Sequence, residues 1–155
     1  MTESRPARTP RRPSAPSVYL ESRYRKLVRG LPQTIFFCPD CKGHRRRRLR
    51  CDRCGGRGKL TDDSVQELIG KALLPAYGAK AGKFHGAGRE DIDVLMLGRG
   101  RPFVFELVGP RRTEHDLEEL RHRILTRDGE RIDLDPFRIV ERPRVAFWKE
   151  GKFDK

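Results

Sequence analysis

The 155-residue sequence has no long hydrophobic segment, and apolar residues make up only 35% of it. A membrane-spanning helix needs about 20 consecutive, predominantly apolar residues, and no run in the sequence approaches this length. The N-terminus is too polar and too rich in proline for a secretory signal. These absences predict a cytoplasmic protein with no membrane partner.

Acidic residues are scarce in the first 60 positions, which hold 4 Asp and Glu against 17 Lys and Arg, whereas positions 61–155 hold 18 of each. The whole net charge of +13 therefore lies in the first part. Basic side chains that neutralise phosphates release condensed counterions, so this asymmetry predicts a nucleic acid partner. A solvated charge run is the alternative interpretation. An anionic membrane surface would require an amphipathic apolar face, which the run Arg45–Arg48 lacks.

Three segments differ in composition. Residues 1–17 have almost no large apolar side chain, which predicts a disordered basic tail. Residues 18–60 form a basic segment that contains every cysteine, and its first part, up to Phe37, favours a short helix or strand. Residues 61–155 are neutral overall and carry mixed helix and strand patterns, which predicts a partial catalytic domain of the α/β (α+β) class.

Cysteine is limited to four residues in two CxxC motifs, nine residues apart: Cys38, Cys41, Cys51 and Cys54. Two such turns supply four thiolates for a tetrahedral Zn²⁺ at about 2.3 Å from each sulfur. Disulfides, a rubredoxin-like iron site and a thioredoxin-type redox pair are the alternatives, but a cytosolic chain with a doubled motif favours zinc. We predict a structural four-cysteine zinc site that leaves no coordination position for catalysis.

The loop between the two CxxC motifs is predicted to contact phosphates, because most of its side chains are guanidinium groups. The predicted RNA-binding residues in this loop are Arg45, Arg46, Arg47, Arg48 and Arg50. The cysteine and glycine pattern also resembles the zinc-binding repeats of Hsp40-type chaperones. A single repeat without a J-domain disfavours a chaperone.

The remaining chain predicts helix, hairpin, helix and strand in that order. Ser64 to Glu67 is a capping box that opens a helix closed by Pro75 and Gly78. A glycine-rich loop over 79–88 is followed by paired strands over 92–97 and 102–108. This hairpin would place Asp91 and Glu106 on neighbouring strands. A helix over 113–125, capped by Thr113, and a last strand over 137–148 with a bulge or edge at Pro143 complete the prediction.

The segment Gly88-Arg89-Glu90-Asp91 comes directly before an apolar strand. A guanidinium beside Asp91 would keep this carboxylate ionised and able to act as a nucleophile or base. Charged residues at strand ends are common, so a surface strand with satisfied charges is the alternative. Asp93, two residues further along the same predicted strand face, is the rival carboxylate.

Several motifs in one order carry a resemblance. They are Arg23-Tyr24-Arg25-Lys26-Leu27, Leu31-Pro32-Gln33-Thr34, the paired CxxC, Ser64-Val65-Gln66-Glu67-Leu68-Ile69, Gly88-Arg89-Glu90-Asp91-Ile92-Asp93-Val94, and Leu97-Gly98-Arg99-Gly100-Arg101-Pro102-Phe103. Together, from about Val18 to Val108, they resemble the Pus-ten family of tRNA pseudouridine synthases.

The resemblance implies a fragment of a pseudouridine-synthase-like mixed sheet with packed helices, beside the small zinc module. It implies isomerisation of a uridine in the TΨC arm of tRNA to pseudouridine, with no organic cofactor and with Asp91 as the catalytic aspartate. The same segment resembles Gly-Arg-Thr-Asp in TruA-type synthases, whose arginine assists base flipping, and this implies that role for Arg89. Arg101, in the last motif, joins the predicted RNA-binding set.

The resemblance also implies a further stretch of chain that carries a tyrosine to stack on the target base. Tyr77 or Phe84 could replace it, or a second subunit or a homodimer could complete the site. The alternative function is a zinc-stapled RNA-binding protein, derived from such a synthase without catalysis or acting as one part of a split enzyme.

Overall fold

A computed structural model describes residues 15–150, and the predicted basic tail lies largely outside this range. One antiparallel sheet forms the centre of the fold, with strand order β2-β3-β1-β4 and with β5 also paired to β1. The strands are β1 (Val18–Lys26), β2 (Ala81–Gly86), β3 (Met96–Val108), β4 (Ile132–Leu134) and β5 (Arg138–Val140). The helices are α1 (Arg45–Arg48), α2 (Val65–Tyr77), α3 (Leu117–Asp128) and α4 (Pro143–Lys149).

Strand β1 occupies the middle of this sheet. It pairs with β3 along almost its whole length, and its other edge pairs first with β5 and then with β4. β1, from the predicted segment 18–60, thus belongs to the same sheet as the strands of residues 61–155. The strand alternative predicted for the start of the 18–37 segment is confirmed, and a loop follows it.

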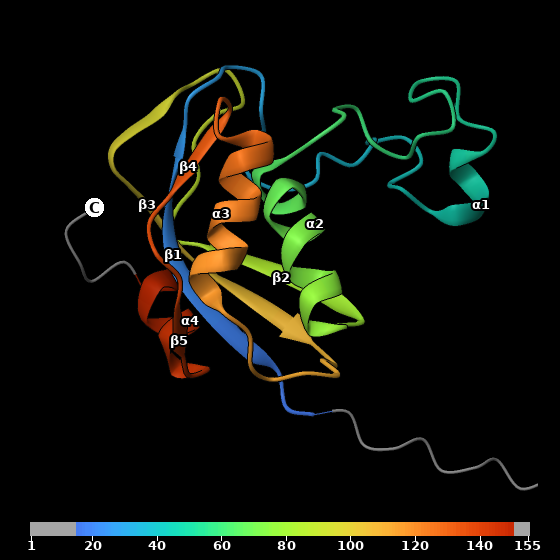
Figure 1. The fold of residues 1–155 in the computed structure, drawn as a ribbon. Helices are drawn as coiled ribbons and strands as arrows, with labels where there is room; N and C mark the ends of the chain where they lie inside the picture. Colours follow the sequence, from blue (N-terminus) through green and yellow to red (C-terminus); the bar gives the residue numbers. More distant parts are fainter. Residues whose placement is uncertain (1–14, 151–155) are drawn as a thin grey trace, which may run out of the picture.

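Helices α2 and α3 lie side by side across one face of the sheet (Figure 1). Alternate residues of β3 point into this layer and are buried against α2, as shown by Phe103, Phe105 and Leu107. The opposite face carries α4, whose Trp148 packs with Val104 of β3. No helix in the described part of the chain combines the length and the apolar character needed to cross a bilayer.

The predicted first helix is confirmed as α2. The Ser64 side chain accepts a hydrogen bond from the Glu67 backbone N–H at 3.1 Å, and Gly78 closes the helix in the left-handed conformation with φ 57°. Pro75 lies inside the last turn and does not end the helix. The Glu67 carboxylate pairs with Lys59 at 2.8 Å, so it ties the start of α2 to the preceding segment.

The predicted hairpin is wrong. Residues 81–86, predicted as a loop, form edge strand β2, and residues 96–108 form one continuous strand that pairs with both β1 and β2. Gly98 and Gly100 have positive φ, yet they mark an irregularity in the register against β1 and not a chain reversal. As a result Glu106 lies opposite Lys83 and Tyr19, while Asp91 lies in the loop before β3.

The C-terminal predictions also need correction. Helix α3 begins at Leu117, and its cap is Asp116, which accepts from the backbone N–H groups of Glu118 and Glu119, so Thr113 is not the cap. The predicted strand over 137–148 is a short strand followed by α4. Pro143 opens that helix, because its fixed φ suits a first helical turn that needs no N–H partner.

Candidate active site and metal centre

The four cysteines lie together in the metal module, which we define as residues 38–60. Their sulfur atoms all lie within 4.8 Å of one another, with 3.7 Å between Cys38 and Cys51 and 3.7 Å between Cys41 and Cys54. A disulfide requires about 2.05 Å, so the thiols are free. Four sulfurs at about 2.3 Å from a central ion in tetrahedral geometry would be about 3.8 Å apart. The spacing therefore fits one metal ion held by four thiolates.

The backbone of the metal module favours the thiolate form of Cys54, whereas burial raises the pKa of the Cys41 thiol to about 11. Burial alone would raise the pKa of the Cys54 thiol, but N–H groups of Gly58 and Gly56 and the neighbouring thiols lower it to about 6. The Gly58 N–H lies 3.2 Å from the Cys54 sulfur. Because the thiolate is the form that binds metal, this cysteine is prepared as a ligand.

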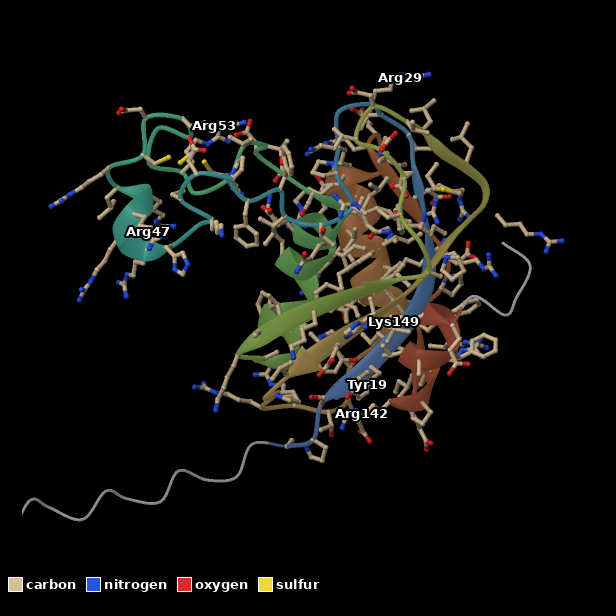
Figure 2. All side chains as sticks on the ribbon, turned by 180° about the vertical axis from the view of Figure 1, so that it is seen from behind. Tyr19, Arg29, Arg47, Arg53, Arg142 and Lys149 are labelled. Carbon is tan, nitrogen blue, oxygen red and sulfur yellow. The ribbon has the colours of Figure 1, made fainter. Side chains whose placement is uncertain are left out.

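The predicted phosphate-binding arginines of the metal module are exposed. The structure places Arg45–Arg48 on the single turn of α1, followed by Leu49, which is 75% exposed, and Arg50. The chain segment that contains α1 projects away from the sheet (Figure 1), and Arg47 and Arg53 mark its surface in Figure 2. The ligand cysteines thus hold a cationic surface outside the main fold.

A second group of polar residues surrounds the carboxylate of Glu90, whose side chain is only 5% exposed. The Tyr24 hydroxyl donates to it at 2.7 Å, and the Arg101 guanidinium donates at 2.8 Å. The ammonium of Lys26 lies 3.6 Å away. Burial, together with the nearby Glu90 charge, raises the pKa of Tyr24, so the phenol remains a hydrogen-bond donor.

Lys26 and Gln33 hold the backbone on either side of Glu90. The Lys26 ammonium is fully buried and donates to the carbonyls of Leu31 at 2.9 Å, Asp91 at 3.0 Å and Ile92 at 3.2 Å. Gln33 donates to the Gly88 carbonyl at 2.9 Å and to the Tyr24 hydroxyl at 3.0 Å. Burial lowers the pKa of Lys26, and the Glu90 carboxylate opposes that shift. We call residues 88–92 the anchored loop.

The backbone hydrogen bonds of the anchored loop hold its neighbouring side chains in different environments. The Glu90 carboxylate is directed inward to Tyr24 and Arg101, while Arg89 and Asp91 are exposed. Both line one hollow of about 200 Å³, whose other lining residues are Pro32, Gln33, Glu90 and Ile92. The structure thus brings Arg89 and Asp91 to one site, although in a loop and not at a strand edge. No aromatic side chain of the described residues lines this hollow.

The other predicted site residues have different positions. Asp93 does not share a strand face with Asp91, because the Val94 N–H bonds to the Asp91 carbonyl in a turn. The Arg101 guanidinium donates to Glu90 and to the Ala87 carbonyl at 3.0 Å, so its RNA-binding role stays a prediction. Tyr77 is fully buried, and the Phe84 ring stacks on Phe103 at 4.8 Å within the core.

Sequence reasoning missed the anchoring roles of Tyr24, Lys26, Gln33 and Glu90. Tyr24, Lys26 and Gln33 stand in motifs that carried the resemblance, but a basic strand alone does not show which of its side chains is buried. The signal that could have found Lys26 is the strand alternation, because Leu20, Tyr24 and Lys26 are separated by even numbers of residues.

Residues 19–155 match the family model described as Pus10, C-terminal. The chain belongs to the Pus10 family. Relatives named tRNA pseudouridine synthase Pus10 include those of Methanothrix thermoacetophila, 44% identical over 89% of this chain, and Methanothermobacter marburgensis, 43% identical over 89%. A third relative of that name, from Methanocaldococcus jannaschii, is 46% identical over 84% of this chain.

The match to Pus10 confirms the family resemblance drawn from the sequence motifs. It covers 29%, 33% and 27%, respectively, of the length of these three relatives. The chain therefore spans about a third of the Pus10 proteins that it resembles. The α+β sheet with packed helices and the four-cysteine cluster belong to this C-terminal part of the family.

Proposed function

We propose that this chain supplies the catalytic aspartate of a tRNA pseudouridine synthase that isomerises a uridine in the TΨC arm. One observation carries the proposal. The Asp91 side chain is exposed at a hollow, while Lys26 holds the Asp91 backbone carbonyl and the side chain of the neighbouring Glu90 is buried. The relatives named tRNA pseudouridine synthase Pus10 support the choice of reaction.

In the proposed reaction the Asp91 carboxylate is the nucleophile that attacks the flipped nucleotide. The carboxylate bonds to C1′ of the ribose as the bond between C1′ and N1 of uracil breaks, the base turns, and its C5 forms the new bond to C1′ as the carboxylate leaves, so that Asp91 is regenerated. C5 loses a proton and N1 gains one, so substrate and product are isomers and no co-reactant is consumed. The uridine has to leave its stack before Asp91 can reach it.

Arg89 is proposed to assist base flipping. Its side chain is exposed and lines the same hollow as Asp91, and no ion pair to a carboxylate is found for it among residues 15–150. A free guanidinium there can occupy the space left by an extruded base or bind the adjacent phosphate. The ring that stacks on the target base is proposed to come from another segment or a second chain.

The metal module is proposed to bind one structural Zn²⁺ through Cys38, Cys41, Cys51 and Cys54. Four thiolates fill a tetrahedral shell, so the ion would organise the module and would not act on substrate. The arginines of α1, with Arg50, would then contact tRNA phosphates. Free, clustered thiols are typical of a reducing compartment, and we place the protein in the cytoplasm.

The test is pseudouridine formation in an unmodified tRNA transcript by the zinc-loaded protein. We expect turnover that Asp91→Asn abolishes while tRNA affinity and unfolding midpoint stay unchanged, because Asp91 is exposed and only its backbone carbonyl, which the substitution keeps, takes part in the anchoring hydrogen bonds. Asp93→Asn is the matched control and should retain activity. Equal activity of wild type and Asp91→Asn would refute the assignment. A wild-type chain that binds tRNA tightly but forms no pseudouridine would instead support the RNA-binding alternative.

A further inference from the structure

A groove runs along α4 on the sheet face opposite to α2 and α3. Its floor comes from three neighbouring strands at one level, since Lys83 lies opposite Glu106 and Glu106 lies opposite Tyr19 in the pairing register. His85 belongs to the same face, because Phe84 between Lys83 and His85 points into the core. Val145 of α4 forms part of the wall of the groove. The groove has a volume of about 600 Å³, which is within the range of small-ligand sites.

Three exposed cations surround this α4 groove, one from a strand and two from the opposite ends of α4. Lys83 is on β2, Arg142 precedes α4, and Lys149 ends α4. Figure 2 shows Arg142 and Lys149 close to Tyr19, far from Arg47 and Arg53 on the metal module. None of the three cations pairs with a carboxylate in the described range 15–150. By contrast Arg138 and Arg144, which reach the same face, both bind the buried carboxylate of Glu21.

The floor of the groove offers hydrogen-bonding groups. His85 Nε2 lies 2.9 Å from a carboxylate oxygen of Glu106, and both side chains are mostly buried. The two side chains can exchange hydrogen bonds with hydroxyl or N–H groups of a ligand. Cations at the rim, together with this hydrogen-bonding floor and the Tyr19 ring, suit a nucleotide, whose phosphates are charged and whose sugar and base carry hydrogen-bonding groups and an aromatic face.

We propose that the α4 groove is a second RNA-binding site, which takes one or two nucleotides of an unpaired segment, with phosphates on Lys83, Arg142 and Lys149. The inference rests on the proposed RNA substrate and adds a contact surface separate from both the metal module and the anchored loop. When one RNA is bound at one of two separated surfaces, its effective concentration at the other surface is high, so each contact raises the overall affinity.

The test measures binding of an unmodified tRNA transcript by the full chain across a salt series. For Arg142→Gln/Lys149→Gln we expect affinity at 0.1 M salt to fall by roughly tenfold or more, and the slope of log K against log salt to shrink by about 1.4. The control Lys80→Gln/Arg111→Gln removes the same charge from exposed sites outside the groove and should change affinity less than about twofold. Equal losses in both double variants would overturn the proposal.

Competition and turnover sharpen the result. A short oligouridine should displace the tRNA transcript more weakly from Arg142→Gln/Lys149→Gln than from wild type. UMP and polyglutamate should displace the transcript poorly from both proteins. Equal competition by UMP would reassign the groove to a free nucleotide, and equal competition by polyglutamate would reduce it to a nonspecific anion surface. Either result overturns the RNA assignment. If wild type binds in the expected way but forms no pseudouridine, the proposed function fails while the groove proposal stands.

Discussion

The metal module and the anchored loop both present charged side chains to solvent, but different interactions hold them. In the module the buried cluster consists of Cys38, Cys41 and Cys54, with Cys51 and Leu60 packed against it. In the loop Lys26 and Gln33 hold the backbone, and Tyr24 holds the Glu90 carboxylate. Tyr24 and Lys26 both lie on the central strand β1.

The metal module and the anchored loop are therefore ordered by different parts of the molecule. So small an apolar cluster cannot offset the conformational entropy of about 20 residues, so we expect the module to depend on a metal ion bound by the four cysteines. The loop inherits the stability of the sheet core and needs no packing of its own. Four variants test this contrast, from the largest expected effect on stability to the smallest.

The largest effect is expected from Cys51→Ser, which removes one of four metal ligands. Structural zinc binding contributes on the order of 10 kcal/mol in small zinc domains, so the module should unfold and tRNA affinity should fall. The sheet core should stay folded, because it contains no residue of the module. Metal analysis and amide-resolved NMR measure the two parts separately.

Asp52→Ala is the control for the cysteine variant, since it changes the exposed neighbour of Cys51 and keeps all four ligands. It should retain one metal ion per chain and the full set of module signals. Loss of the sheet signals in Cys51→Ser would contradict the independence of the two regions.

Lys26→Met should have the next largest effect, about 3 kcal/mol or more of unfolding free energy. It removes three donors from backbone carbonyls and leaves the buried Glu90 without its ammonium partner. Urea unfolding gives the stability, and pseudouridine formation should fall further than the unfolded fraction explains. Arg29→Met is the control, because the Arg29 side chain donates at the surface to the Asp93 carbonyl and takes no part in the Glu90 network. Its cost should stay near 0.5 kcal/mol.

A smaller, pH-dependent effect is expected at Glu21. Burial raises the pKa of this carboxyl, but hydrogen bonds from Arg144, Trp148 and Arg138 outweigh burial and lower it below its usual value of 4.5. A lowered pKa in the folded state means that Glu21 stabilises the fold above about pH 4.5, and that this stabilisation is lost as pH falls through the lowered pKa.

Wild type and Glu21→Gln should therefore differ most in stability near pH 7 and converge in acid. Urea unfolding at several pH values, followed by the fluorescence of Trp148, the single tryptophan, measures this. The pKa values of Asp63 and Asp133 are also lowered, so they too make stability depend on pH. Both proteins contain these two residues, so their contribution cancels when the unfolding free energy of one protein is subtracted from that of the other. A gap that widens in acid would contradict the role of Glu21.

The smallest effect on stability is expected when Arg45–Arg48 are all replaced by Gln. These side chains are exposed, so the unfolding free energy of the sheet should change by less than about 0.5 kcal/mol. The salt slope of tRNA binding should nevertheless shrink by about 3, because up to four phosphate contacts disappear. An unchanged slope would remove α1 from the RNA contact surface.

Local features of the chain could be predicted from sequence, and features that depend on distant partners could not. Helix α2 and the four-cysteine cluster follow from short-range signals, namely the Ser64 cap and the CxxC spacing. The prediction for residues 81–108 is wrong, because β3 stays extended through its glycines by pairing with β1, which lies at the start of the described chain. Glu90 is recognisable only as part of a motif, since its partner Tyr24 lies 66 positions earlier in the chain.

The same distinction explains the C-terminal region. The local pattern at Pro143 predicts a strand irregularity, but Trp148 and Arg144 reach Glu21 more than 120 positions away, and this contact favours a helix over residues 143–149. For the candidate site, Arg89 and Asp91 could be identified from sequence. The side chains that orient them could not, because burial of Lys26 is decided by the whole sheet.

The central position of β1 also sets an order of events during synthesis. β1 leaves the ribosome before the other strands of the sheet, but its Tyr19 pairs with Val140, so the sheet stays incomplete until almost all of the described chain has emerged. The metal module closes between residues 13 positions apart and can fold as soon as it meets its ion. Such a high share of distant contacts slows folding, and the nascent chain would therefore display its arginine surface well before Asp91 is in place.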